Sequence, residues 1–117
     1  MSNTARPGVK SGDRIDAGDI AEALTRAPFT YTDGATQVFA RGGHTTYTED
    51  GHTTSGKWGV DDQGHFWSFW PPTYRATYDV FWITDANAGA VGIRFTDLNR
   101  GVSSEGRYIS KPLSSPG

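Results

Sequence analysis

The feature that most constrains the fold of this chain is the spacing of its turn signals. From residue 33 onward, pairs or clusters of Gly, Pro, Asp and Asn recur every seven to twelve residues. They are Asp33-Gly34, Gly42-Gly43, Asp50-Gly51, residues 61–64, Pro71-Pro72, residues 85–89 and residues 99–101. Between them polar and apolar residues alternate, which is typical of strands with one buried face. The pattern therefore predicts antiparallel strands joined by short turns.

The fold class that we predict is mainly β, an antiparallel up-and-down barrel of about eight strands. The expected strands are 28–32, 35–41, 44–49, 52–60, 65–70, 74–84, 90–97 and 105–110. Closing such a sheet removes its exposed edges and leaves room for one small ligand. The alternative is an open, strongly curved sheet with a helix packed on its concave face, where the same residues would line a cone-shaped pocket.

One short helix is expected before the strands, between residues 16 and 27. Apolar residues recur there at helical spacing: Ile20, Ala23, Leu24 and Ala27. Asp19 and Glu22 match a capping box, and Pro28 ends the element. Residues 1–13 and 111–117 are polar, contain Gly and Pro, and read as flexible tails, which leaves one domain over residues 14–110.

Composition excludes several classes of function. The net charge is −2 and the basic residues are scattered, so the chain shows no footprint for nucleic acid. It has no cysteine, which rules out disulfides and Cys-based zinc sites. No apolar run is long enough for a signal peptide or a membrane span, so we expect a cytoplasmic protein that does not enter a membrane. We also expect no cofactor.

The Asp50-Gly51 pair fixes the register of its hairpin, because a two-residue loop pairs residue 49 with 52, 47 with 54 and 45 with 56. One face of the hairpin then carries Thr45, Tyr47, His52, Thr54, Trp58 and Val60, and the other carries His44, Thr46, Thr53, Ser55 and Lys57. His44 and His52 point to opposite sides of the sheet. We therefore expect no metal site.

The hairpin that follows has two possible registers. With a four-residue loop over 61–64, Trp58 faces Trp67 and Val60 faces His65. With a bulge at Gly64 the register shifts by one residue, and Phe66, Ser68 and Trp70 share the face of Trp58. Further on, one face of strand 74–84 carries Tyr74, Ala76, Tyr78, Val80 and Trp82, and one face of strand 90–97 carries Val91, Ile93 and Phe95.

Aromatic residues are concentrated between Trp58 and Trp82, a stretch that holds all four tryptophans. A domain of this size holds so many rings either in an aromatic-lined cavity or in a solid core with a sticky outer face. For a cavity, the expected ligand-binding residues are Tyr47, Trp58, Trp67, Trp70, Tyr78 and Trp82. Arg94 could neutralise a carboxylate of the ligand, although a strand arginine commonly faces outward.

Acid/base chemistry has three candidate residues: Asp79 beside Tyr78, and His65 near Asp61 and Asp62. A solvated strand residue or a turn cap is the alternative for each. The sequence contains no nucleophile elbow, Walker loop, dinucleotide fingerprint or H-E-x-x-H motif. An enzyme built on this chain would act by proton transfer or by shaping its substrate, as an isomerase or a cyclase does.

The run Gly56-Lys57-Trp58-Gly59-Val60, then Phe69-Trp70-Pro71-Pro72 and Tyr78-Asp79-Val80, resembles small bacterial lipocalin-type (calycin-like) barrels over roughly residues 36–109. In those barrels a G-x-W-x-V strand precedes a turn and an aromatic strand. The chain departs from true lipocalins because two or three strands separate its helix from the G-x-W motif. The resemblance implies a barrel with an internal ligand site.

Three functions follow as hypotheses. The first is binding of a small apolar or aromatic molecule inside the barrel. The second is an isomerase or cyclase using the same cavity, which a buried titratable group such as Asp79 or His65 pointing into it would favour. The third is a homodimer or partner interface formed by strand 65–70 with Trp70-Pro71-Pro72. In either register we expect Trp58 to be buried on the concave side of the sheet.

Overall fold

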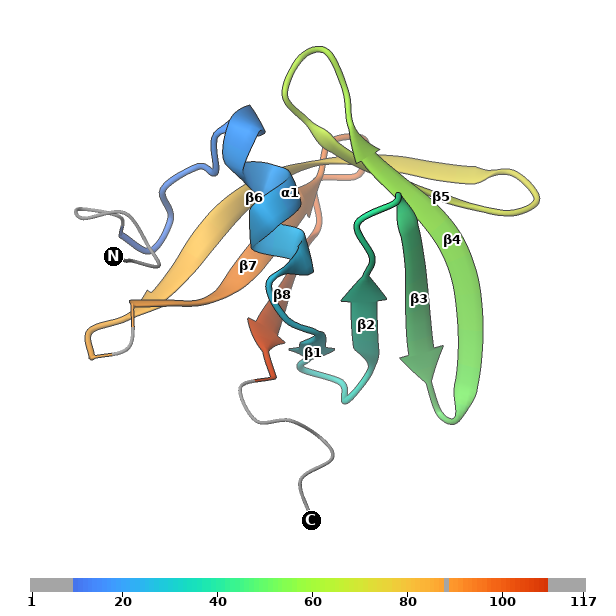
Figure 1. Cartoon of the computed structure of the whole chain (residues 1–117), viewed down its shortest axis with the longest axis horizontal. Coiled ribbons are helices and arrows are strands. Elements are labelled where there is room, and N and C mark those ends of the chain that lie inside the picture. Colours follow the sequence, from blue (N-terminus) through green and yellow to red (C-terminus); the bar gives the residue numbers. More distant parts are fainter. Residues whose placement is uncertain (1–9, 88, 110–117) are drawn as a thin grey trace.

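The computed structural model describes residues 10–87 and 89–109. A helix, α1 (Ala17–Thr25), precedes eight strands that pair in sequence order and close into an antiparallel barrel. The strands are β1 (Phe29–Tyr31), β2 (Thr36–Phe39), β3 (His44–Glu49), β4 (His52–Val60), β5 (Phe66–Trp70), β6 (Tyr74–Asp85), β7 (Gly89–Asp97) and β8 (Ser103–Tyr108). Figure 1 shows α1 between the long β6–β7 hairpin on one side and β2 to β4 on the other. The predicted fold class is confirmed.

Closure is made by β1, which is only three residues long and pairs with β2 on one side and β8 on the other. Phe29 lies opposite Tyr108 and Tyr31 lies opposite Gly106. The open-sheet alternative is therefore wrong. Predicted and observed bounds agree for β3 and β4, while β8 begins at Ser103, two residues before its predicted start.

The β3–β4 hairpin has the register that its Asp-Gly turn predicts. Asp50 and Gly51 both have positive φ, 52° and 80°, as a type I′ turn requires. Glu49 pairs with His52, and Tyr47 pairs with Thr54. Residues of this hairpin whose side chains face into the barrel therefore include Thr45, Tyr47 and Trp58, as expected.

The β4–β5 hairpin adopts the second of its two expected registers. Gly64 has a φ of 83°, and its N–H donates to the carbonyl of Asp61, so the turn ends in a glycine bulge. Trp58 then lies opposite Ser68, and Val60 lies opposite Phe66. The register with a four-residue loop is wrong. Phe66, Ser68 and Trp70 share the inner face with Trp58.

The helix begins and ends inside its predicted bounds. Asp16 is its N-cap and Asp19 lies in the first turn, so Asp19 and Glu22 form no capping box. That prediction is wrong because Glu22 instead accepts two hydrogen bonds from Arg26, at 3.0 and 2.6 Å. The apolar side chains of the helix, Ile20, Ala23 and Leu24, are buried against the barrel.

Helix α1 and the segment before it cover one end of the barrel. The hydroxyl of Tyr108 donates to the Ala23 carbonyl at 2.7 Å, which ties the helix to β8. Upstream, the N–H of Ile15 donates to Val80 at 3.0 Å and the N–H of Trp82 donates to Asp13 at 2.8 Å, so the segment pairs with β6. The folded part therefore extends upstream of residue 14. The rest of the predicted tails, 1–9 and 111–117, lies outside the described residues.

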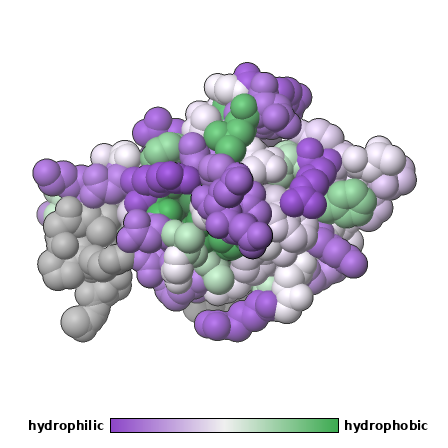
Figure 2. All heavy atoms as spheres, turned by 90° about the horizontal axis from the view of Figure 1, so that it is seen from above, coloured by the Kyte–Doolittle hydropathy of each residue, from purple (hydrophilic) through white to green (hydrophobic). Residues whose placement is uncertain are grey.

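The core fills this end of the barrel beneath the helix. Its fully buried side chains include Ile15, Ile20, Leu24, Phe29 and Ile93. Figure 2 shows apolar residues as small separate patches among hydrophilic ones on the face seen from above. In the described part of the chain, the large apolar side chains that are exposed are Val38, Tyr74, Leu98 and Val102. None of the described helical residues forms a helix long and apolar enough to cross a membrane.

Candidate functional site

A cavity of about 310 Å³ lies inside the barrel, away from the helix. Asp33 comes from the β1–β2 turn and Ser104 from the start of β8, so the cavity opens at the end of the barrel opposite α1. The residues that line it are Tyr31, Thr32, Asp33, Gln37, Phe39, Tyr47, Phe66, Ser68, Trp70, Tyr78, Phe95, Ser104 and Glu105. Its volume is near the lower end of the range for small-molecule sites.

The upper wall of the cavity is built from aromatic rings set at an angle to one another. The Tyr31 and Tyr47 ring centroids are 6.1 Å apart with an interplanar angle of 47°. Tyr47 and Trp70 are 6.3 Å apart at 71°. This wall arises because the inner faces of β1, β3 and β5 all place an aromatic residue near the open end.

The floor of the cavity is a packed group of three phenylalanines. Phe39 lies 5.6 Å from Phe66 and 6.4 Å from Phe95, and Phe66 lies 5.7 Å from Phe95. Tyr78 stacks on Phe66 with ring centroids 5.3 Å apart, which joins the floor to the wall. Interlocked rings of this kind give a cavity with fixed, apolar sides.

A buried polar chain stiffens the wall beside β2. The hydroxyl of Tyr31 donates to Oε1 of Gln37 at 2.6 Å, and Nε2 of Gln37 donates to Oγ1 of Thr45 at 3.0 Å. The hydroxyl of Thr45 donates in turn to the Val38 carbonyl at 2.8 Å. Gln37 and Thr45 are buried, so these bonds satisfy polar groups that would otherwise be costly to bury.

The tyrosine hydroxyls of the cavity are held in their protonated form. Burial raises the pKa of Tyr31 well above its usual range, with smaller effects of Tyr47, Tyr78 and Asp33. Burial also raises the pKa of Tyr47, and it raises that of Tyr78 against an opposing hydrogen bond from Ser68. At neutral pH these phenols are hydrogen-bond donors and not bases.

Three of the predicted ligand-binding residues, Tyr47, Trp70 and Tyr78, line the cavity. Trp58 faces inward and is 7% exposed, so its predicted burial is confirmed. It lies in the core below the cavity, edge-on to Phe39, with its indole N–H donating to the Ala40 carbonyl at 2.9 Å. Trp58 therefore supports the floor and does not line the site.

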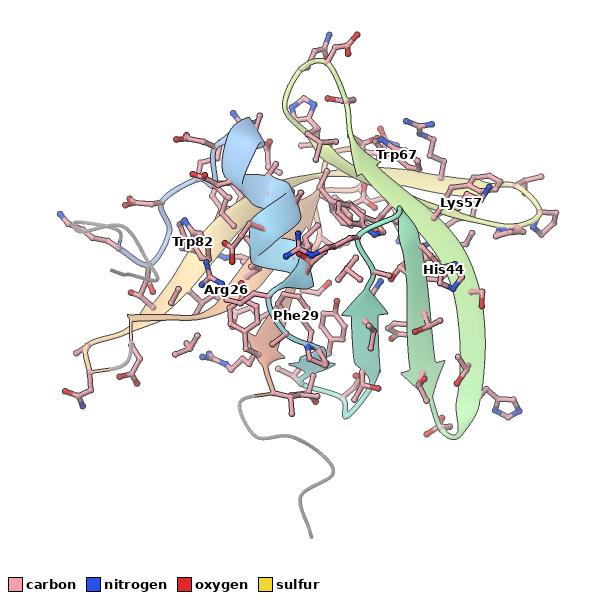
Figure 3. All side chains as sticks on the ribbon, in the orientation of Figure 1. Arg26, Phe29, His44, Lys57, Trp67 and Trp82 are labelled. Carbon is pink, nitrogen blue, oxygen red and sulfur yellow. The ribbon has the colours of Figure 1, made fainter. Side chains whose placement is uncertain are left out.

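Trp82 is also placed by the structure in the packed end of the barrel and not in the cavity. Its side chain is on the inner face of β6, where Arg26 lies over the ring at 5.3 Å from the centroid. Figure 3 shows Arg26 and Trp82 close together near the end of the helix. The prediction of a ligand contact at Trp82 is wrong because the helix covers this end.

Trp67 and Arg94 lie on the outer face of the barrel, so their predicted role in the cavity is wrong. Trp67 packs against the backbone of Gly59, and Arg75 lies over its ring at 4.6 Å. Arg94 lies 4.0 Å from Glu105 and over the ring of Phe81. Both residues alternate with inward neighbours along their strands, which sends their side chains outward.

The candidate acid/base residues do not meet in one site. Tyr78 points into the barrel, and Asp79, the next residue, points out, where it pairs with Arg14 at 2.8 Å. His65 lies outside as well, 3.6 Å from Asp79 and 3.7 Å from Asp61. The predicted pairing of Asp79 with Tyr78 is therefore wrong. Within the described ranges, His, Cys, Asp and Glu form no group of three or more that could hold a metal ion.

Asp61 acts mainly on the β4–β5 turn. Its Oδ1 accepts hydrogen bonds from the N–H groups of Gln63 and His65, both at 2.9 Å. These backbone bonds, the one from His65 first, hold the pKa of Asp61 below its usual value. The turn-cap alternative considered for this group agrees with the structure.

Sequence reasoning missed half of the cavity. The lining residues that it did not select are Tyr31, Gln37, Phe39, Phe66, Ser68 and Phe95, together with the rim residues. A signal was present for Gln37 and Phe39, which alternate with Ala35 at a period of two and share its inward face. Phe95 was assigned inward, but nothing marked it as part of a ligand site.

Two glycines of β4 hold the neighbouring tryptophans. A Cβ on Gly56 would lie 2.6 Å from both the Trp70 ring and the Phe69 carbonyl oxygen, and a Cβ on Gly59 would lie 2.7 Å from the Trp67 ring. The G-K-W-G motif therefore lets one indole pack on each face of β4. Gly56 in this way sets the position of Trp70, a wall of the cavity.

A scan against models of protein families matched none of them, and neither the curated proteins nor the solved structures gave a match to this chain.

Proposed function

We propose that this protein binds a small apolar or aromatic molecule in the barrel cavity. The observation that carries the proposal is the construction of the cavity, about 310 Å³ enclosed by tyrosine, tryptophan and phenylalanine rings. Apolar burial and ring stacking would supply affinity there, and the protonated hydroxyls of Tyr47 and Tyr78 would orient the ligand. The small volume favours a ligand with one or two rings.

Passive binding is favoured over an isomerase or cyclase by where the titratable groups lie. Asp79 and His65, the residues chosen for proton transfer, are outside the barrel. The raised pKa of Tyr78 keeps this phenol from acting as a base near neutral pH. In the described part of the cavity the carboxylates are Asp33 and Glu105, both at the rim.

Isothermal titration calorimetry and thermal shift with p-cresol, indole and benzyltrimethylammonium test the proposal. We expect at least one probe to bind and to raise the melting temperature. Trp70→Leu removes a cavity wall and should weaken binding at least about tenfold, because buried aromatic contacts dominate such sites. Trp67→Leu, the matched change on the outer face, should leave affinity within about twofold. No binding by any probe, or equal losses in the two variants, would contradict the proposal.

The remaining expectations stay predictions. A lipocalin-type relationship is supported by the barrel and its internal cavity, but by no matched family. Cytoplasmic location and a homodimer are likewise proposals. For self-association through β5, the aromatic residues available on the outer face are Trp67 and Phe69, because Trp70 is turned into the cavity.

A further inference from the structure

The charged residues that line the cavity are of one sign. Among the described lining residues, the charged ones are Asp33 and Glu105, and both are at the open end. Arg94 and Arg107 lie beside Glu105, at 4.0 and 3.7 Å, and offset its charge. Asp33 is thus the carboxylate that shapes the potential at the mouth.

The charge of Asp33 is not offset by a salt bridge with any described residue. Its Oδ1 accepts a hydrogen bond from the N–H of Ala35 at 3.0 Å, which fixes the carboxylate in the β1–β2 turn. The negative field reaches the tyrosines: Asp33 and Glu49 both add, after burial, to the raised pKa of Tyr47. The other cation on this side, Arg100, is paired with Asp97 at 3.5 Å.

The aromatic wall below Asp33 has the same electrostatic preference. An aromatic ring is negative over its face and positive at its edge. The polar edge groups of two rings are already bonded within the wall, since the Tyr31 hydroxyl donates to Gln37 and the Trp70 N–H donates to Ser68 at 3.1 Å. What the wall offers a ligand is therefore mainly ring faces, the surface that attracts cations.

From the carboxylate at the mouth and the ring faces below it, we infer that the ligand of this cavity is an organic cation, with an ammonium group between Asp33 and the rings of Tyr31, Tyr47 and Trp70. Its apolar or aromatic body lies on the phenylalanine floor. This inference rests on the proposed function, and it narrows the ligand class from neutral aromatic molecules to amines and quaternary ammonium compounds.

Two ligands of the same shape test the charge directly. Benzyltrimethylammonium and neopentylbenzene differ by a cationic nitrogen in place of a carbon. We expect the cation to bind wild-type protein at least about tenfold more tightly in calorimetry, as cation–π contacts and a nearby carboxylate both favour it. Added salt should weaken binding of the cation and leave that of the hydrocarbon unchanged.

Asp33→Asn tests the carboxylate. The amide keeps an oxygen that can accept the Ala35 N–H, so the turn should survive and only the charge is lost. We expect affinity for benzyltrimethylammonium to fall about three- to tenfold, with affinity for neopentylbenzene unchanged. Asp62→Asn removes the same charge from the exposed β4–β5 turn at the other end of the barrel and should change neither affinity.

The outcomes separate the two proposals. If the hydrocarbon binds as tightly as the cation, the inference of a cationic ligand is overturned and the binding function stands. If Trp70→Leu weakens both ligands but salt affects neither, the same conclusion follows even where Asp33→Asn proves unstable. If neither compound binds and neither shifts the melting temperature, both proposals fall.

Discussion

The guanidinium of Arg26 lies over the indole of Trp82, 5.3 Å from the ring centroid, at the junction between the helix and the barrel. The same group lies 5.5 Å from the ring of Tyr108, and Glu22 holds it with two hydrogen bonds. One side chain at the end of α1 thus contacts β6 and β8 together. Figure 3 shows this contact beside the helix.

Replacing Arg26 should therefore loosen the helix from the barrel. We expect Arg26→Ala to lower the free energy of unfolding by about 1–2 kcal/mol, from lost cation–π contact and lost packing of the aliphatic stem. Urea titration followed by circular dichroism measures this. Arg41→Ala, in the exposed β2–β3 turn, is the matched control and should stay within about 0.5 kcal/mol of wild type. Equal effects would show that the stacking adds no stability.

Gly56→Ala should disturb the cavity wall. The added methyl group would lie 2.6 Å from the Phe69 carbonyl oxygen and from the Trp70 ring, so strand and indole must move apart. We expect a loss of about 1–3 kcal/mol, as for other overpacked sites, and a shifted tryptophan emission. Gly42→Ala meets nothing within 4 Å and has no strained φ, so it should cost little. A Gly56→Ala protein as stable as the Gly42→Ala protein would contradict the packing described above.

Trp58 separates support of the floor from contact with ligand. Trp58→Ala should cost about 3–5 kcal/mol, because it empties a large buried volume. Trp58→Phe keeps most of this volume but loses the hydrogen bond to Ala40, so we expect a smaller loss of about 1 kcal/mol. Affinity for benzyltrimethylammonium should stay within about twofold in Trp58→Phe. A fall in affinity larger than the fall in stability would place the indole in the site after all.

Stability should fall in acid through Asp97. The backbone N–H groups of Arg100 and Asn99 donate to its carboxylate at 3.0 and 2.8 Å, and these bonds, with the nearby Arg100 side chain, hold the pKa of Asp97 below its usual value. A lowered folded-state pKa means that the unfolded chain takes up the proton first. The stabilisation is present above about pH 4, the ordinary aspartate value, and is lost as pH falls through the lower folded value.

Urea titrations at pH 6 and pH 3 measure this dependence. Asp97→Asn keeps an oxygen for both N–H groups but cannot titrate, so we expect it to be less stable than wild type at pH 6 and to lose less between the two pH values. The exposed Asp62→Asn should show the pH dependence of wild type. An unchanged acid loss in Asp97→Asn would mean that other carboxylates account for it.

Period-two alternation predicted correctly which residues face into the barrel. Tyr47, Trp58, Tyr78 and Phe95 all lie on their predicted inner faces. The same alternation already placed Asp79 and Arg94 on the opposite faces, and assigning them to a ligand or an active site went against that pattern. Short-range turn chemistry was also sufficient at Asp50-Gly51, where two residues determine the register.

Alternation could not predict how deep along the barrel a residue lies. Tyr78 and Trp82 share the inner face of β6, but four residues of strand separate them by about 13 Å. One lines the cavity and the other is packed under the helix. Which end is covered depends on contacts between distant segments, such as Tyr108 with Ala23, and a local pattern carries no record of them.

The short strand β1 also bears on the order in which this chain can fold. Every other pair of neighbouring barrel strands is adjacent in the sequence and can form as a hairpin, whereas β1 and β8 come from opposite ends of the described chain. Pairing them requires closure of almost the whole chain for three residues of strand, which is entropically the slowest contact to gain. We therefore expect the hairpins to form early and the seam at Phe29–Tyr31 to be the last part of the barrel to become protected from hydrogen exchange and the first to open.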